Sequence, residues 1–349
     1  MKTGVDYYPE HWDKSLWEQD ADLMKKSGVS LVRMAEFAWS KMEPEEGVYD
    51  FAWLDEAVKL FEDRNIEVIL CTPTNCPPLW LYEKYPEVLQ TGRDGKRQEP
   101  AIRGHRCYNA PAYRGFVEKF VRKMGEHYQN MANLAAWQID NEVEAGFCCC
   151  DSCAEKLREW LKEKYGSLEA VNQAYHNEVW SGSYSAWSQV HPPLGDRPVT
   201  QYNPAYMLDY QRFMSDSTID YVNFQQRLLR EYFPQTPITT NTWFCDHMPD
   251  FYKLFDKLDF CSYDNYPATV LPEEGYYSHA FHLDFIRGVK QKNFWIMEQL
   301  SGTPGCWMPM APTVKPGMIK GYGMQAFAHG ADAVINFRFR SAVGGAEMF

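Results

Sequence analysis

Long apolar runs are missing from this chain of 349 residues. No stretch approaches the roughly 18 uninterrupted apolar residues that suggest a membrane-spanning helix, so we predict no membrane contact. The first residues, MKTGVDYYPEHW, contain no apolar core of a signal peptide. The sequence therefore predicts a cytoplasmic protein, in which thiols or a metal site explain the ten cysteines better than disulfides do.

Basic residues are also fewer than acidic ones. The chain carries 35 Lys and Arg against 47 Asp and Glu, a net charge of −12, and has no long basic run. Because binding a phosphate backbone needs a basic surface, we expect no nucleic-acid partner. The chain lacks HExxH, GxSxG, a Walker loop and a dinucleotide fingerprint. The histidine pair His279 and His282 has no third ligand nearby, so a catalytic metal is not indicated.

What the chain does contain is an alternation of short apolar runs and amphipathic helical stretches. Eight runs have the character of strands: Gly4–Tyr8, Ser30–Met34, Glu67–Cys71, Ala135–Ile139, Ile238–Thr242, Asp259–Tyr263, Phe294–Met297 and Ala333–Phe337. Helical patterns lie between most of them, such as Ser15–Lys26, Trp53–Asp63, Tyr113–His127, Cys153–Lys164 and Met207–Glu231. Eight such repeats favour a parallel (β/α)₈ barrel. An open doubly wound sheet would more usually show a Gly-rich turn after its first strand, and GVDYYPEH contains none.

Two connections in this pattern are unusually long. One is Thr72–Ala110, after the third strand, and the other follows the fourth strand and runs on through Tyr165–Pro204. Loops at the carboxyl ends of barrel strands build active sites, so we expect the site there. After the eighth run only RFRSAVGGAEMF follows, too little for an eighth helix. We therefore expect residues 1–349 to be one catalytic barrel domain of a natural protein that continues past Phe349.

Two glutamates stand where strands of such a barrel end. Glu142 follows the fourth run in WQIDNE, and Glu298 follows the seventh in FWIMEQ. Strands four and seven lie across the barrel mouth from each other, so the two carboxylates can face one another. A retaining glycosidase uses such a pair about 5 Å apart, one as nucleophile and one as acid and then base. Asn141, directly before Glu142, can bind a sugar 2-hydroxyl, and Arg33, ending the second strand, can stabilise Glu298 electrostatically.

Many specific stretches occur together and in the same order in one known family: GVDYYPEHW, VRMAEFAWSKMEPEEGVYDF, TPTNCPPLWL, RGHRCYN, WQIDNE, a C-x-C-x-x-C run, PITTN, SYDNYP, FWIMEQ, QAFAHGADAVINFRFR and GAE. On these residues, which span almost the whole chain, the sequence resembles glycoside hydrolase family 42, bacterial β-galactosidases with catalytic acids on strands four and seven. The resemblance implies that Glu142 is the acid/base and Glu298 the nucleophile. It also implies two further domains after the barrel and a homotrimer in which a neighbouring subunit closes the active site.

The resemblance further implies a galactose pocket formed by Arg103, Asn141, Tyr266, Trp307 and Glu347. Arg103 offers a forked donor to hydroxyls or to a carboxylate. Tyr266 can donate a hydrogen bond to the nucleophile and keep it ionised. Trp307 can provide a flat apolar floor, and Glu347 can accept hydrogen bonds from two vicinal hydroxyls.

The cysteines suggest a second site. Cys148, Cys150 and Cys153, together with the distant Cys107, provide four thiolates suited to tetrahedral zinc. Four protein ligands leave no open position for water, so such a zinc is structural. Cys149 makes the register ambiguous, but neighbours on an extended loop point to opposite sides, so Cys148 and Cys150 can share a side that Cys149 cannot. Free thiols, or a disulfide under oxidation, are the alternatives.

The sequence therefore predicts a retaining β-galactosidase that releases terminal non-reducing β-D-galactose from galactosides and galacto-oligosaccharides. An α-L-arabinopyranosidase or a β-D-fucosidase on the same scaffold is the alternative, because these sugars share the hydroxyl pattern of galactose. A non-catalytic carbohydrate-binding barrel is a third possibility, against which both intact acids argue. Glu144, two residues past Glu142, is expected to be a solvated acid.

Overall fold

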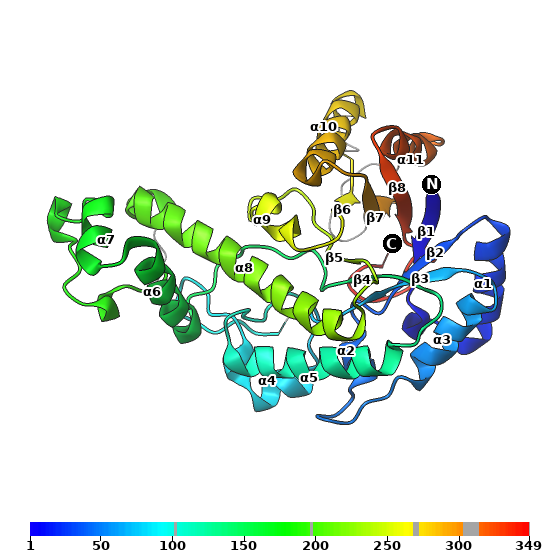
Figure 1. Cartoon of the computed structure of the whole chain (residues 1–349), viewed down its shortest axis with the longest axis horizontal. Helices are drawn as coiled ribbons and strands as arrows, with labels where there is room; N and C mark the ends of the chain where they lie inside the picture. The colour runs from blue at the N-terminus through cyan, green and yellow to red at the C-terminus, as the bar shows by residue number, and fades with distance from the viewer. Residues whose placement is uncertain (101–102, 196–197, 268–271, 303–313, 349) are drawn as a thin grey trace.

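The computed structural model describes residues 1–349 except 101–102, 196–197, 268–271, 303–313 and 349, and the side chains of residues 272–274. Eight parallel strands form one sheet (Figure 1): β1 (Lys2–Asp6), β2 (Leu31–Met34), β3 (Glu67–Cys71), β4 (Leu134–Gln138), β5 (Ile238–Thr239), β6 (Ser262–Asn265), β7 (Phe294–Leu300) and β8 (Ala331–Phe337). Their spatial order is β5-β4-β3-β2-β1-β8-β7-β6, so the first and last strands of the chain pair with each other.

The two strands at the ends of this order, β5 and β6, are joined by separate hydrogen bonds rather than by a continuous ladder. The amide of Asp259 donates to the carbonyl of Ile238 (3.0 Å), and the amide of Asp264 donates to the carbonyl of Thr242 (2.8 Å). The sheet is therefore a nearly closed barrel. This confirms the (β/α)₈ fold predicted from the alternating pattern.

Helices lie between the strands: α1 (Trp17–Lys26), α2 (Trp39–Met42), α3 (Ala52–Glu62), α4 (Leu79–Lys84), α5 (Pro111–Tyr128), α6 (Asp151–Tyr165), α7 (Leu168–Tyr175), α8 (Pro204–Tyr232), α9 (Phe251–Asp256), α10 (Pro272–Lys290) and α11 (Met318–Ala328). The five helical patterns named from the sequence all form helices, with ends within three residues of those predicted. None of the helices in the described ranges combines the length and the apolar character needed to cross a bilayer.

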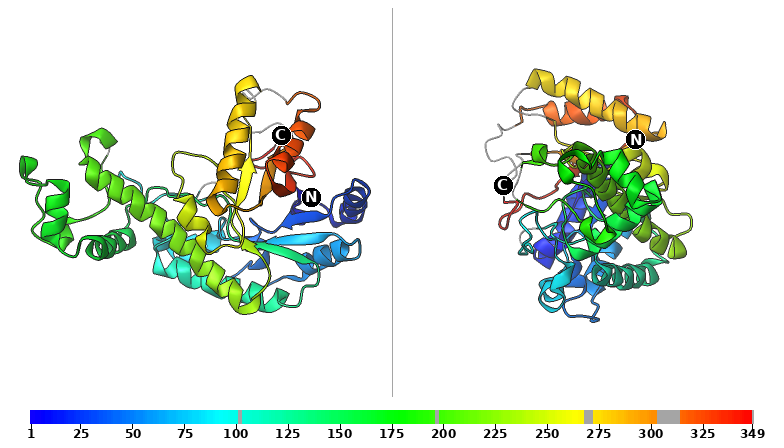
Figure 2. Two further views of the ribbon diagram at one scale, coloured as in Figure 1. Left: turned by 45° about the horizontal axis from the view of Figure 1, so that its top comes forward. Right: turned by 90° about the vertical axis from the view of Figure 1, so that its left-hand side faces the viewer.

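The long segment after β4 forms an extension that projects from the barrel (Figures 1 and 2). It contains α6 and α7. Part of Tyr165–Pro204, predicted as a connection, is therefore helical. The chain returns along α8, whose 29 residues span about 44 Å and pack against α5. This extension places the cysteine-containing loop and α6 beside the barrel mouth.

The barrel interior changes from apolar to charged along the strands. A small inner cluster contains Leu31, Ile69, Ala136, Met297, Ala333 and Ile335. Because side chains alternate between the two faces of a strand, the residue two positions further on also points inward. That step leads from Leu31 to Arg33 and from Ala136 to Gln138, and both are fully buried. On β1 the same step leads from Gly4, where a Cβ would lie 2.9 Å from the carbonyl oxygen of Leu31, to Asp6. The strands therefore carry polar groups at their carboxyl ends, where the two long connections meet.

Two glycines within α5 offer a matched test of the packing between α5 and α8. A Cβ on Gly115 would meet nothing within 4 Å, whereas a Cβ on Gly125 would lie 2.5 Å from the ring of Tyr232. We expect Gly115→Ala to stabilise the protein by about 0.5–1 kcal/mol, because alanine is the better helix former. We expect Gly125→Ala to destabilise it by about 1–2 kcal/mol, because the clash outweighs the same gain. Urea denaturation of both variants checks this, and equal shifts of the midpoints would contradict the packing described.

Candidate active site

A sharp turn after β4 brings Asn141 and Glu142 to the barrel mouth. Asp140 and Glu142 have left-handed backbone conformations, with φ of 55° and 45°. Such conformations are costly for residues other than glycine and persist where surrounding contacts enforce them. The buried carboxylate of Asp140 makes such contacts, accepting hydrogen bonds from Arg106 (2.7 Å) and Thr74 (2.7 Å). The buried polar network beneath the turn therefore fixes the position of Glu142.

The carboxylate of Glu142 is partly buried, with 15% of the side chain exposed. Arg103, from the connection after β3, donates from Nη2 to Glu142 Oε2 (2.9 Å). Asn141 Nδ2 donates to the same oxygen (3.2 Å), and the amide of Glu142 donates to Asn241 Oδ1 (2.9 Å). Three separate segments of the chain thus fix the orientation of this acid.

Glu298 lies in β7 on the facing side and is 4% exposed. The hydroxyl of Tyr266 donates to its Oε2 (2.6 Å), and Arg33 Nη1 donates to its Oε1 (2.8 Å). Asn241 Nδ2 also approaches Oε1, at 3.4 Å. Donors of this kind stabilise the charged form of a carboxylate, which is the form that a nucleophile requires.

Three carboxylates meet across the mouth. One oxygen each from Glu142, Asp264 and Glu298 lies within 4.8 Å of the others. Asp264 accepts a hydrogen bond from Asn241 Nδ2 at 2.6 Å. Carboxyl groups about 5–5.5 Å apart are typical of retaining glycosidases, while inverting enzymes separate them by about 6.5–9.5 Å. The close approach of Glu142 and Glu298 fits the retaining arrangement.

Burial and repulsion between these acids change their protonation. Burial, reinforced by the charge of Glu298, raises the pKa of Glu142 to about 7, while Arg103 opposes the rise. Burial, followed by the charge of Glu298, also raises the pKa of Asp264 well above its usual range. A carboxyl group that keeps its proton near neutral pH can act as a general acid. Glu142 therefore has the environment of a general acid.

Arg33 places a fully buried guanidinium beneath the mouth. Its Nη1 contacts Asp6 (3.1 Å) as well as Glu298, and its Nη2 donates to Asn141 Oδ1 (2.6 Å). Glu36 lies 3.6 Å from Nη2. One positive charge cannot balance three buried carboxylates, and burial raises the pKa of Asp6 well above its usual range. Burial and the neighbouring carboxylates thus outweigh the opposing charge of Arg33 at Asp6.

The remaining predicted pocket residues divide between the mouth and the undescribed part of the chain. Glu347 Oε2 lies 3.5 Å from Arg338 Nη1. Burial works against the charge of Arg103, but the carboxylates around it, Glu347 among them, raise the pKa of Arg103. Glu347 is therefore close to the same mouth. Trp307 lies outside the described residues.

Two central residues were not singled out from the sequence. Asn241 contacts the carboxylates of Asp264 and Glu298 through Nδ2 and accepts the backbone amide of Glu142 through Oδ1. A signal was present, because both Asn241 and Asp264 stand at the carboxyl ends of apolar runs, in PITTN and SYDNYP. Glu144, expected to be a solvated acid, is partly exposed, and its Oε1 accepts a hydrogen bond from Trp243 Nε1 (3.2 Å) that the sequence did not predict.

Four cysteines cluster beside the mouth: Cys107, Cys148, Cys150 and Cys153. One sulfur atom from each lies within 4.8 Å of the others, and Cys107 Sγ is 3.5 Å from both Cys150 Sγ and Cys153 Sγ. Cys149 is not in this cluster, and its Sγ lies 3.6 Å from the carbonyl oxygen of Pro193. The four thiols join the connections after β3 and β4 and could bind a metal ion.

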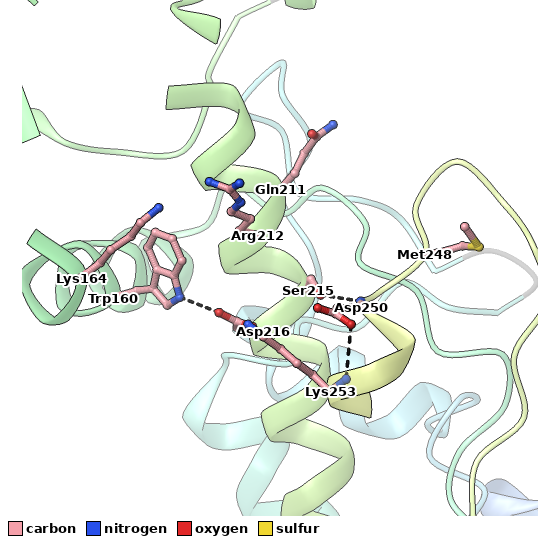
Figure 3. A pocket seen from close by; sticks show the side chains of 9 residues that line it. All are labelled: Trp160, Lys164, Gln211, Arg212, Ser215, Asp216, Met248, Asp250 and Lys253. Atoms are coloured by element: carbon pink, nitrogen blue, oxygen red, sulfur yellow. Dashed lines mark hydrogen bonds and ion pairs between the residues drawn. The ribbon is translucent and has the colours of Figure 1, made fainter. Parts of the chain in front are cut away.

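A separate cavity lies away from the mouth. It has a volume of about 470 Å³ and is bounded by α6, α8 and the start of α9 (Figure 3). Its polar groups are largely paired within the protein, because Asp216 accepts from Trp160 Nε1 (2.9 Å) and from Lys253 Nζ (2.8 Å), while Lys164 pairs with Asp209. The acids that lie close together, Glu142, Asp264 and Glu298, are at the barrel mouth instead, where burial and the charge of Glu298 raise the pKa of the other two. The mouth is therefore the candidate functional site.

Comparison with known proteins agrees with this architecture. The family model described as Beta-galactosidase, that of glycoside hydrolase family 42, matches residues 6–349. The chain is 59% identical to Beta-galactosidase BgaA of Clostridium cellulovorans over 351 residues, covering 100% of this chain and 53% of that protein. It thus spans about half the length of the curated relatives it matches.

Solved structures give the same picture. The polyextremophilic β-galactosidase of Halorubrum lacusprofundi superposes with a TM-score of 0.94 at 35% identity, covering 99% of this chain and 54% of that one. The β-galactosidase of Bacillus circulans superposes with a TM-score of 0.94 at 33% identity, covering 100% of this chain and 52% of that one. The family match over nearly every residue, on a barrel with facing acids at the ends of β4 and β7, means that the chain belongs to glycoside hydrolase family 42.

Proposed function

We propose that this chain is the catalytic barrel of a retaining β-galactosidase, which releases terminal non-reducing β-D-galactose from galactosides and galacto-oligosaccharides. The observation that carries the proposal is the approach of Glu142 and Glu298 oxygens to within 4.8 Å across the mouth. That spacing leaves no room for the water of an inverting reaction. The similar proteins named above are β-galactosidases, which supports galactose as the sugar.

The reaction follows from the two environments. Glu298, with Tyr266 and Arg33 donating to it, attacks the anomeric carbon and forms a covalent glycosyl ester. Glu142, with its raised pKa, gives its proton to the leaving oxygen in the same step. The Glu142 carboxylate then takes a proton from water, and the resulting hydroxide displaces Glu298 from the sugar. Two displacements restore the original configuration at the anomeric carbon.

The remaining pocket residues have roles that their contacts suggest. Asn141 Oδ1 already accepts from Arg33 (2.6 Å) and Asn241 (2.8 Å), so its amide nitrogen is the group that faces a sugar hydroxyl. Arg103 binds Glu142 and can turn part of its fork to a hydroxyl. Glu347 completes the proposed pocket as an acceptor, and Trp307, outside the described residues, is proposed as its apolar floor from the family resemblance alone.

The cysteine cluster is proposed to hold one structural zinc ion. Zinc–sulfur bonds of about 2.3 Å in a tetrahedron place the sulfur atoms about 3.8 Å apart, and the distances of 3.5 Å from Cys107 are close to this value. The zinc would tie the two long connections together and take no part in catalysis. The cytoplasmic location, the homotrimer and the domains following the barrel remain predictions drawn from the sequence.

The two glutamates should respond differently to removal. Glu298→Ala should lower turnover of every β-galactoside by about 10⁴-fold or more, because no covalent ester can form. Glu142→Ala should lower hydrolysis of galactobiose by about 10²–10⁴-fold, because an alcohol leaves poorly without a proton. It should slow the first, ester-forming step with dinitrophenyl β-galactoside far less, since dinitrophenolate needs no proton.

Steady-state and burst kinetics on the full-length protein measure these effects, with the exposed Glu155→Ala as a control that should match wild type. Normal turnover by Glu298→Ala would refute the nucleophile assignment. A nitrophenyl panel settles the sugar: higher kcat/KM on the β-D-fucoside or the α-L-arabinopyranoside would replace galactose. No hydrolysis of any glycoside would favour a binding barrel.

The pH dependence should report Glu142. We expect kcat/KM to fall above about pH 7, where this acid loses its proton. Because Arg103 lowers the pKa of Glu142, Arg103→Met should move the alkaline limb upward by about one unit. Arg122→Met, on the outer helix α5, is the control and should leave the limb in place. A downward shift, or none, in Arg103→Met would contradict the assigned acid.

Metal content tests the cysteine cluster with two adjacent buried residues. We expect about one zinc ion per chain in protein purified without chelator. Cys148→Ser should remove most of it and lower the Tm by about 5 °C or more, because the two connections lose their link. Cys149→Ser should keep the metal, since this thiol lies outside the cluster. Elemental analysis and thermal unfolding measure both, and zinc-free wild type would disprove the site.

A further inference from the structure

An indole ring is exposed at the rim of the proposed active site. Trp243 follows β5 by four residues and is 40% exposed. Its Nε1 donates to Glu144 Oε1 at 3.2 Å, so the polar edge of the ring is already paired within the protein. What the side chain offers to solvent is therefore its flat apolar face. Aromatic faces of this kind pack against the C–H surfaces of sugar rings.

Trp243 and Glu144 are each only two residues away in sequence from a residue at the proposed acid. Asn241, two residues before Trp243, accepts the amide hydrogen of Glu142 at 2.9 Å, and Glu144 is two residues beyond Glu142. Burial raises the pKa of the Cys245 thiol, two residues past Trp243, to about 11, and the charges of Glu144 and Glu142 add to the rise. The indole is thus tied to Glu144 after β4, and the loop that carries it is tied through Asn241 to the backbone of Glu142.

This side of Glu142 is where a leaving group must lie. The sugar that is cleaved occupies the space between Glu142 and Glu298, and the leaving oxygen receives its proton from Glu142. The leaving group therefore extends past Glu142, away from Glu298 on β7. The loops after β4 and β5, which carry Glu144 and Trp243, border that direction.

The two loops are tied to each other and to the barrel. The amide of Ala145 donates to the carbonyl of His247 (2.7 Å), and Thr218 Oγ1 donates to the carbonyl of Glu144 (3.1 Å). A cavity of about 150 Å³ lies between these two loops and α8, with Phe147 and His247 among its walls. These hydrogen bonds hold the loops that carry Glu144 and Trp243, so the ring face is preorganised.

We propose that Trp243, oriented by Glu144, is the binding platform for the leaving sugar. This inference rests on the proposed β-galactosidase activity and names the substrate class: galactosides whose leaving group is itself a sugar ring, rather than galactosides of small alcohols. The carboxylates of Glu144 and Asp246 at this rim oppose an anionic leaving group, so the platform fits an uncharged sugar.

Two substrates that differ in their leaving groups test the platform. Galactobiose places a sugar over Trp243, whereas β-galactosyl fluoride releases fluoride and places nothing there. We expect Trp243→Ala to lower the ratio of kcat/KM for galactobiose to kcat/KM for the fluoride by about tenfold. Trp243→Phe keeps an aromatic face and should retain most of the ratio. Phe281→Ala, an exposed aromatic residue on α10 that is 63% accessible, is the control and should leave the ratio unchanged.

The outcomes separate this inference from the function on which it rests. Hydrolysis of neither substrate by wild-type protein would overturn the proposed activity and the platform with it. Hydrolysis of both with the wild-type ratio in Trp243→Ala would overturn the platform alone. A changed oligomeric state of Trp243→Ala in size-exclusion chromatography, with an unchanged ratio, would assign the indole to a subunit contact instead.

Discussion

The buried guanidinium of Arg33 is the interaction on which the rest of the site depends. It joins carboxylates from β1 and β7 to the amide of Asn141 after β4, so three parts of the barrel share one cation. Removing a single partner from such a buried network leaves an uncompensated charge, which costs far more than the network contributes while intact. The inner face of the barrel can carry this polarity because its opposite end is filled by aliphatic side chains.

Backbone strain occurs at the proposed acid/base, Glu142, and is offset by hydrogen bonds beneath it. Asp140 and Glu142 both occupy the left-handed region, and the buried Asp140 carboxylate accepts from Arg106 and Thr74. A straight continuation of β4 would alternate residues 140, 141 and 142 between barrel interior and exterior. The bent turn instead lets the adjacent side chains of Asn141 and Glu142 face the same mouth, where Asn141 Nδ2 donates to Glu142. The strained turn thus places two adjacent side chains on the same side of the chain.

The sequence alone predicted the features that follow from the repeated strand–helix unit. Strand and helix periodicity gave the barrel, and the ends of β4 and β7 gave both glutamates. The position of Asn241 at the end of an apolar run was a signal, but its contacts were not predictable. They and the pairing of Glu144 with Trp243 depend on how neighbouring strands are aligned across the β5 edge, where regular pairing stops. The sequence also predicted which cysteines of the run cluster, because side chains alternate along an extended loop and Cys149 points away from Cys148 and Cys150.

The cysteine cluster and the acid pair are separate in chemistry but connected in structure. Arg103 lies four residues before Cys107, and Glu142 lies six residues before Cys148, so each connection contributes residues to both sites. The hydrogen bond of 2.9 Å between Arg103 and Glu142 spans the same two connections as the sulfur contacts. Long loops lose substantial conformational entropy when they are held in one arrangement. A link between the loops outside the mouth lowers that cost at the mouth, so Arg103 can lie against the acid and tune its pKa without itself having to hold the loops together.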